Sequence, residues 1–498
     1  MPRAPGLPEG PARAYLGPMR PAPPELSPEA AMSVVAADPQ SPAAWEALAL
    51  AWDRAGRADV AEPAWARLTQ LSPRSAFAWA GRSLCLRRAR RFPEALAAVR
   101  RAALLAPGEA WVQVNLSAML LLVDAYDEAL AAAQRATALE PADPAAWGAL
   151  HNAAVALGDT PLALAAVDRA AALDPADPRL RWNRSLCALS AGDWATGWAG
   201  YEARLERPGA RLPPDPRWDG RAGPQRLLVT LEQGLGDTVQ LLHLLGAARA
   251  RVDSLTVAAP IGLQGVLRGV PGVDRLVEPE AVRAGPALFD VAVALPSLPA
   301  LLGTRPETAA VGVPALQADP AAQARWAGRL AALAPGAALR VGLCWQGNPS
   351  YEADHRRSPG LMALGPLGAV PGVGWFSLQK VHGQLAEQPR RPFEIHDLDP
   401  ELDADGVFCD TIPCLAALDL LITGDTALAH LAGQLGRPVW LALCWAPDWR
   451  WGRAGEGSPW YPSMRVFRQP RPGDWRAVYT EMAAVLASSP PARPAPNR

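Results

Sequence analysis

The sequence has almost no lysine. Lys380 is the only one among 48 basic residues, and the other 47 are arginines. These are balanced by 49 acidic residues, which leaves a formal net charge of −1. A chain with so little net charge has no overall electrostatic attraction for nucleic acid or an anionic membrane, so we expect neither as the main partner.

The six cysteines form no CxxC pair and show no zinc-ligand spacing. In a chain of this length they are typical of reduced thiols in packed cores, which predicts a cytoplasmic protein. No group of carboxylates has metal-ligand spacing either, so we expect no bound metal and no cofactor. The cysteines are Cys85, Cys187, Cys344, Cys409, Cys414 and Cys444.

Long apolar runs are also missing. The best candidate, 112–123, is short and interrupted by Asn115 and Ser117, so no membrane span is predicted. Residues 1–30 have no apolar segment of a secretory signal, and their many prolines predict a disordered lead-in. A disordered tail is expected at 486–498.

The first half of the chain repeats every 34 residues. Tryptophan comes early in the repeat (Trp45, Trp79, Trp147), and alanine and proline follow in a fixed frame. This period resembles the tetratricopeptide repeat, in which small residues let paired helices approach closely and proline ends the second helix. The recurring residues are Ala61, Ala95, Ala129 and Ala163, with Pro73, Pro107, Pro141 and Pro175.

The pattern predicts an α-solenoid over 31–207 with about five units. The last unit is altered and carries Trp194, Trp198 and Tyr201, as expected where an array ends or docks on another part of the protein. Such arrays offer a concave surface, which favours binding of a protein or peptide; a spacer or dimerisation element is the alternative.

After a proline-rich linker at 208–225, short β-branched runs alternate with helical stretches. This alternation predicts βαβ units and parallel sheets in two α/β lobes. The first lobe is expected at 226–318 and the second at 339–485, joined by a helix and hinge at 319–338. Open parallel sheets bind ligands at the carboxyl ends of their strands, so a site is expected between the lobes.

The stretch 231–240, LEQGLGDTVQ, follows the first of these strands and holds Gly234, Gly236 and Asp237. It is neither a complete dinucleotide fingerprint nor a P-loop. By itself it is compatible with a tight strand-to-helix turn in which Asp237 caps the helix.

A second motif, 418–440, predicts a buried strand ending at Gly424 and a helix opened by Asp425 and Thr426. Free N–H groups at a helix start suit a diphosphate, and His430 lies one turn further on the same face. The alternative is that Asp425 only caps the helix and His430 packs in a core.

Three further loops follow predicted strands. The loop 343–361 is polar and contains Asn348, Arg356 and Arg357, of which arginine can clamp a phosphate. Lys380 follows the next strand, where its ammonium is expected to reach a leaving phosphate. The aromatic stretch 444–469 can stack on a base or sugar, or simply hold a C-terminal segment.

From about 226 to 485 these segments resemble bacterial tetratricopeptide-repeat proteins whose C-terminal glycosyltransferase domain is related to the heptosyltransferases. The matching pieces are EQGLGDTVQ, GLCWQGNPSYEADHRRS, SLQK, DTIPCLAALDLLITGDTALAHLAGQLGRPVW and APDWRWG…SPWYPSMRVFRQ. The order of parts also resembles the O-linked N-acetylglucosamine transferases. The resemblance implies a GT-B fold of two Rossmann-like lobes and a nucleotide-sugar co-substrate bound mainly by the second lobe.

The resemblance further implies that Gly424, Asp425, Thr426 and His430 lie against the donor diphosphate. It implies that Gly234, Gly236 and Asp237 face the sugar and acceptor. The heptosyltransferase lysine has no certain match, and Lys380 or Arg357 is the candidate to replace it. We expect metal-independent transfer with inversion, with Asp237 as the base. The alternative is a non-catalytic repeat scaffold with a degenerate transferase-like domain.

Overall fold

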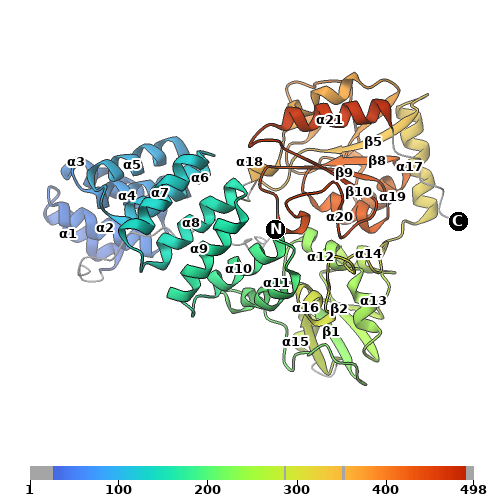
Figure 1. Ribbon diagram of the computed structural model, residues 1–498, viewed down its shortest axis with the longest axis horizontal. Coiled ribbons are helices and arrows are strands. Elements are labelled where there is room, and N and C mark those ends of the chain that lie inside the picture. Colours follow the sequence, from blue (N-terminus) through green and yellow to red (C-terminus); the bar gives the residue numbers. More distant parts are fainter. Residues whose placement is uncertain (1–25, 285–287, 350, 352–353, 490–498) are drawn as a thin grey trace. The chain divides into compact units, whose positions relative to one another are not determined.

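The computed structural model describes residues 26–489 except 285–287, 350 and 352–353 (Figure 1). The predicted disordered lead-in and tail lie largely outside the described residues. Within the described residues, the first helix already begins at Pro28 and the last continues to Ser488. The chain divides between residues 184 and 185 into two compact units.

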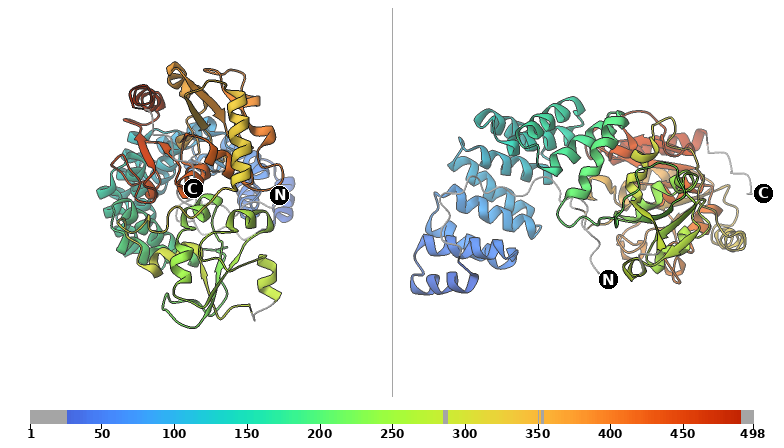
Figure 2. Two further views of the ribbon diagram at one scale, coloured as in Figure 1. Left: turned by 90° about the vertical axis from the view of Figure 1, so that its right-hand side faces the viewer. Right: turned by 90° about the horizontal axis from the view of Figure 1, so that it is seen from below.

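The first unit is an array of antiparallel helix pairs, seen in blue to green in Figures 1 and 2. The first helices of successive pairs start at Pro42, Ala76, Ala110 and Pro144, so the structural repeat keeps the 34-residue period of the sequence. The helices are α1 (Pro28–Ala37), α2 (Pro42–Arg54), α3 (Ala58–Leu71), α4 (Ala76–Arg88), α5 (Phe92–Leu105), α6 (Ala110–Leu122), α7 (Tyr126–Leu139), α8 (Pro144–Leu157), α9 (Thr160–Leu173) and α10 (Pro178–Ser190), which continues into the second unit.

The recurring tryptophan and proline are joined by a hydrogen bond. The indole N–H of Trp45 donates to the carbonyl of Pro39 at 2.9 Å, and Trp147 donates in the same way to Pro141. In the third unit, where the tryptophan is missing, the amide of Gln113 takes the same place and donates to Pro107 at 3.3 Å. The recurring alanines are fully buried between paired helices, as predicted. The tetratricopeptide-like array is therefore confirmed.

In the second unit, the end of α10 is followed by the rest of the altered final repeat, α11 (Trp194–Tyr201) and the 3₁₀ turn η1 (Glu202–Glu206). The predicted linker that follows is partly packed. Arg217 forms a parallel bridge with Ala292 in strand β4, and Trp218 is 4% exposed. A buried tryptophan fixes the linker along the sheet edge rather than leaving it as a free tether.

The first α/β part (226–318) has a four-stranded parallel sheet of order β3-β2-β1-β4. Its strands are short, and those beginning at Arg226, Ser254 and Val291 are mostly buried, which is why the sequence shows apolar runs rather than alternation. The elements are β1 (Arg226–Thr230), α12 (Leu235–Leu241), α13 (Leu244–Arg249), β2 (Ser254–Ala258), α14 (Ile261–Leu267), β3 (Arg275–Val277), α15 (Pro279–Ala284), β4 (Val291–Ala294), η3 (Leu295–Ser297) and α16 (Leu298–Leu302).

The second α/β part (319–489) has a six-stranded parallel sheet of order β10-β9-β8-β5-β6-β7. The eight β-branched runs that predicted strands each coincide with one, whereas β7 and β10 were not predicted; the runs are 226–230, 254–259, 274–278, 290–295, 340–345, 374–379, 418–424 and 438–443. The elements are α17 (Pro320–Leu333), β5 (Leu339–Cys344), α18 (Asp354–Arg357), η4 (Leu361–Ala369), β6 (Val373–Ser377), η5 (Leu385–Glu387), β7 (His396–Asp397), η6 (Asp399–Glu401), α19 (Thr411–Ala417), β8 (Leu420–Thr423), α20 (Ala427–Gln434), β9 (Val439–Leu443), η7 (Trp449–Trp451), β10 (Met464–Arg468) and α21 (Trp475–Ser488).

The two α/β parts pack directly on each other. Helix α12 of the first lies against α20 of the second (Figure 1). The buried side-chain amide of Gln434 donates to the carbonyls of Val239 and Gln240 at 3.0 and 2.9 Å. Because α12 follows β1 and α20 follows β8, these contacts bring the carboxyl ends of both sheets together.

Candidate functional site

The glycine loop, residues 231–237, consists of the connection after β1 and the first residues of α12. Gly234 is the N-cap of α12, and the Asp237 carboxylate reaches back to accept its N–H at 3.1 Å. Asp237 therefore lies inside the first turn instead of at the capping position considered from the sequence. This hydrogen bond fixes the carboxylate at the edge of the first sheet, facing the second α/β part.

Arg450 is the partner of Asp237 and was not singled out in the sequence. Its guanidinium forms an ion pair with Asp237, donates to Gln240 at 2.5 Å and pairs with Asp448 at 2.7 Å. Its side chain is 12% exposed and lies over the ring of Trp449. The Asp448 and Asp237 carboxylates raise the pKa of Arg450 although burial opposes this, so the guanidinium stays charged. One arginine of the second part thus joins the loop of the first.

His430 lies on α20, next to Gly236 of the glycine loop. A Cβ atom at Gly236 would lie 3.5 Å from the imidazole Cδ2, an ordinary van der Waals distance, so the ring lies directly beside the loop. The Nδ1 atom is 2.9 Å from the Tyr461 hydroxyl, and the ring stacks on Trp451. Burial, followed by the Arg450 charge, lowers the pKa of His430 to about 3. The imidazole is therefore neutral at pH 7 and contributes no positive charge.

The turn between β8 and α20 holds Gly424, Asp425 and Thr426. The Thr426 hydroxyl pairs with that of Thr423 at 2.9 Å and makes no capping bond to the helix. Gly424 passes close to the carbonyl of Arg357, where a Cβ would lie 3.1 Å from the oxygen. Burial, and then the Asp448 charge, raise the pKa of Asp425 to about 6. Asp425 does not cap α20, because Thr426 occupies the N-cap position.

The loop after β5 supplies Arg357, whose Nε donates to Asp354 at 2.9 Å and whose guanidinium lies over Tyr351. Asp425 is the main group that raises the pKa of Arg357 against the effect of burial. Arg357 and Asp425 therefore belong to one charged cluster. Asn348 is exposed and Arg356 half-buried in the same loop.

Lys380 points elsewhere. Its ammonium donates to the carbonyl of Leu402 and lies 4.0 Å from Asp399. The prediction that it reaches a leaving phosphate has no support from its described contacts. Its neighbour Gln379, which the sequence did not highlight, links two loops by accepting the N–H of Trp345 at 2.9 Å and donating to the His382 carbonyl at 2.6 Å.

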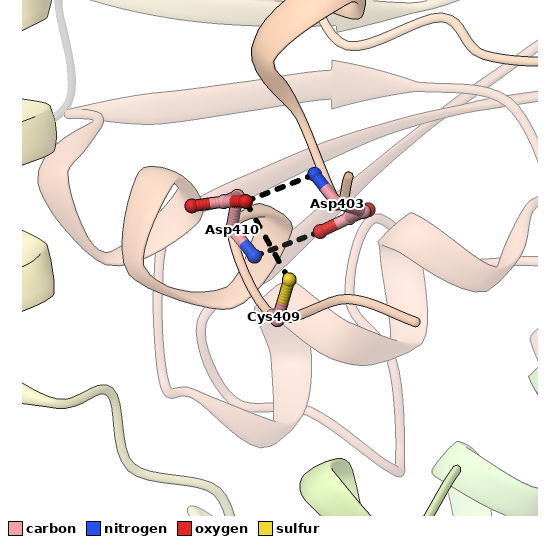
Figure 3. Close-up of side chains that lie close together, drawn as sticks. All are labelled: Asp403, Cys409 and Asp410. Carbon is pink, nitrogen blue, oxygen red and sulfur yellow. Dashed lines mark hydrogen bonds between the residues drawn. The ribbon is translucent and has the colours of Figure 1, made fainter. Parts of the chain in front are cut away.

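The fold also brings Asp403, Cys409 and Asp410 together, although their spacing in the sequence is not that of a metal site (Figure 3). The two aspartates accept each other's main-chain N–H, at 2.8 and 3.1 Å. Asp403 also accepts from the Thr411 hydroxyl, and Asp410 from the indole of Trp326 on α17. These carboxylate oxygens already accept hydrogen bonds from the protein. The cluster is therefore best explained as a structural one, which fixes the loop before α19 and joins it to α17.

The altered final repeat packs on the segment that contains Trp449 and Trp460, next to Arg450. Trp194 stacks on Trp460 with ring centroids 4.9 Å apart, and Trp198 and Tyr201 meet Trp449 edge-on. The indole of Trp198 donates to the carbonyl of Thr304. The sequence-based expectation that this unit docks on another part of the protein is confirmed.

No protein-family model matches the chain. Protein FlbA of Caulobacter vibrioides is 29% identical over 339 residues, which cover 62% of this chain and 54% of FlbA. The chain thus spans about half the length of this curated relative. Among the described residues, no helix has the length and apolar character required to cross a membrane.

Solved structures of helical repeat proteins are similar to about a third of the chain. YrrB, described as a TPR protein with an unusual peptide-binding site, is 15% identical, with 36% of this chain and 93% of YrrB covered and a TM-score of 0.30. MamA of Desulfovibrio magneticus RS-1 is 17% identical, with 33% and 93% covered and a TM-score of 0.30. Scores this low add nothing to the repeat geometry described above.

Proposed function

We propose that residues 226–485 form a GT-B-type glycosyltransferase that uses a nucleotide sugar, needs no metal ion and inverts the sugar carbon. The observation that carries this proposal is the meeting of two parallel-sheet carboxyl edges at Asp237, Arg450 and His430. Such edges are where open α/β sheets bind ligands. The helical array is proposed to bind a protein partner or the acceptor.

In the proposed reaction, Arg357 and Arg450 stabilise the diphosphate as it leaves. The acceptor hydroxyl oxygen forms a bond to the sugar carbon, the bond from that carbon to the diphosphate oxygen breaks, and the hydroxyl proton passes to Asp237. Arg450 is bound to Asp237 in the structure, so the diphosphate must draw Arg450 away before Asp237 can accept a proton. Proton transfer to Asp237 therefore requires that the donor is already bound.

The first experiment measures thermal stabilisation of the full chain by UDP-, GDP-, ADP- and CMP-linked sugars. A ligand that binds only the folded state raises the melting midpoint. We expect one nucleotide class to do so, and Arg357→Ala to abolish the shift. Arg329→Ala is the matched control, because Arg329 pairs with Glu401 on the protein surface.

Turnover is followed through release of the nucleotide, which is the nucleoside diphosphate for UDP-, GDP- and ADP-linked sugars and CMP for a CMP-linked sugar. Asp237→Asn is expected to remove release and to leave the donor-induced shift in melting midpoint nearly intact. Unchanged release would reject Asp237 as the base.

A non-catalytic scaffold is the second candidate, favoured by one observation: in the structure Arg450 neutralises the intended base. No stabilisation by any nucleotide sugar, together with no release, would leave the scaffold as the function.

A further inference from the structure

The glycine loop is held by the final repeat as well as by its own sheet. Glu232 is 7% exposed, and its carboxylate accepts from Arg204 Nε at 2.5 Å. The next residue, Gln233, lies within hydrogen-bond distance of the Tyr201 hydroxyl, at 3.3 Å. Two consecutive side chains of the loop thus bind residues of α11 and η1, about 30 positions earlier in the chain.

Arg204 is the centre of this contact. Its side chain is 2% exposed, it donates to Ser297 Oγ at 2.7 Å and to the carbonyl of Tyr201 at 3.2 Å, and it pairs with Glu202. Ser297 follows β4, as Glu232 follows β1. One guanidinium therefore fixes two neighbouring loops at the carboxyl edge of the first sheet.

The chemistry of the site requires arginine. Burial raises the pKa of Glu232 although the Arg204 charge opposes it, so the carboxylate needs its cation to stay ionised. A guanidinium presents five donors in a fixed plane and can serve Glu232, Glu202, Ser297 and a carbonyl at once. A lysine ammonium is a compact charge on a flexible stem and cannot reproduce this geometry.

We propose that Arg204 is a positioning residue for the reaction, and that the final repeat contributes to the site by holding the glycine loop. This inference rests on the proposed function. Arg204 acts through the glycine loop, which carries Asp237, whereas Arg357 and Asp425 belong to the other α/β part. Loss of Arg204 should therefore lower kcat much more than it raises the KM for the donor.

The test uses the full chain with Arg204→Lys and Arg204→Met. Hydrogen exchange is measured on peptides covering 231–238, with 254–258 in β2 as the internal reference. We expect exchange of the loop to rise about tenfold or more in both variants while β2 is unchanged. We also expect kcat for nucleotide release to fall about tenfold or more, with the donor KM within about twofold.

Arg251→Met is the matched control. Arg251 lies in the first α/β part, donates to the carbonyls of Gly220 and Leu301, and makes no described contact with the glycine loop. Tyr201→Phe is the milder variant if the Arg204 variants do not fold, since it removes only the hydroxyl that meets Gln233 and keeps the ring. We expect it to raise exchange of the same peptide about threefold.

Unchanged loop exchange in Arg204→Lys and Arg204→Met, or in Tyr201→Phe where only that variant folds, would overturn the inference. A rise in donor KM as large as the fall in kcat would also overturn it. If the unmodified protein releases no nucleotide, the proposed function fails, while exchange still decides whether Arg204 holds the loop.

Discussion

The helical array and the α/β unit are stabilised in different ways. In the array the same small set of contacts recurs: a buried alanine between paired helices and an indole bonded to the carbonyl six residues earlier. In the α/β unit the decisive contacts occur once and join distant residues, as when Arg450 reaches Gln240 across 210 positions. The array is therefore stabilised by many similar contacts between neighbouring helices, whereas the site depends on a few contacts between residues far apart in the chain.

This difference predicts that the largest loss of stability follows removal of Arg450. Arg450→Met keeps much of the side-chain volume but leaves Asp237, which is 14% exposed, without its cation. Breaking a buried ion pair from one side costs about 3–5 kcal/mol. Chemical denaturation, with hydrogen exchange reporting each unit, measures the loss in the α/β unit.

The matched change in the array is Arg91→Met. Arg91 pairs with Glu94, but both side chains are about half exposed, so water already weakens the pair; its other acidic neighbour, Glu62, is 3.9 Å away. We expect a free energy of unfolding close to that of the unmodified protein. Equal losses in the two variants would remove the contrast between the units.

The contrast also explains what the sequence could predict. The 34-residue period placed the helix pairs, and apolar runs such as 226–230 and 438–443 placed strands, because both signals are local. Arg450 and Arg204 went unnoticed because their partners lie far away in the chain. Strand β10 was hidden in a stretch interpreted as an aromatic loop, and the contacts of Lys380 with Leu402 and Asp399 had no signal in the sequence.

One glycine from each unit allows the two units to be compared through the same substitution. A Cβ at Gly81 in the array would lie 2.6 Å from the Trp65 ring, and one at Gly433 would lie 2.6 Å from the Tyr461 ring. Overpacking costs about 1–3 kcal/mol, so both alanine variants should be destabilised by similar amounts. Only Gly433→Ala should also weaken nucleotide-sugar binding, because Tyr461 holds His430.

Gly148 is the control for both changes. It lies inside α8, and a Cβ there would meet nothing within 4 Å. Gly148→Ala should raise stability by about 0.5–1 kcal/mol through the lower helix propensity of glycine. Weakened ligand binding in Gly81→Ala would mean that the array and the site are coupled more tightly than these contacts indicate.

The last comparison is the effect of acid on the stability of the α/β unit, to which His430 contributes. Its pKa is about 3 when folded against an ordinary 6.5, so between these values the unfolded chain binds the extra proton and acid favours unfolding. At pH 5 the penalty relative to pH 7 is about 2 kcal/mol. Asp425 works in the opposite direction, since its folded pKa of about 6 lies above its ordinary value and acid favours its folded form. The two effects must therefore be separated by substitution.

The measurement is the free energy of unfolding of the α/β unit at pH 7 and pH 5, in the unmodified protein and in His430→Gln. Contributions of Asp425 and of His243, whose pKa burial lowers to about 4, are shared by both proteins and cancel in the difference. We expect the variant to lose about 2 kcal/mol less on acidification. An identical loss would mean that the pKa of His430 in the folded protein is close to its ordinary 6.5, and the lowered pKa of the buried imidazole would have to be abandoned.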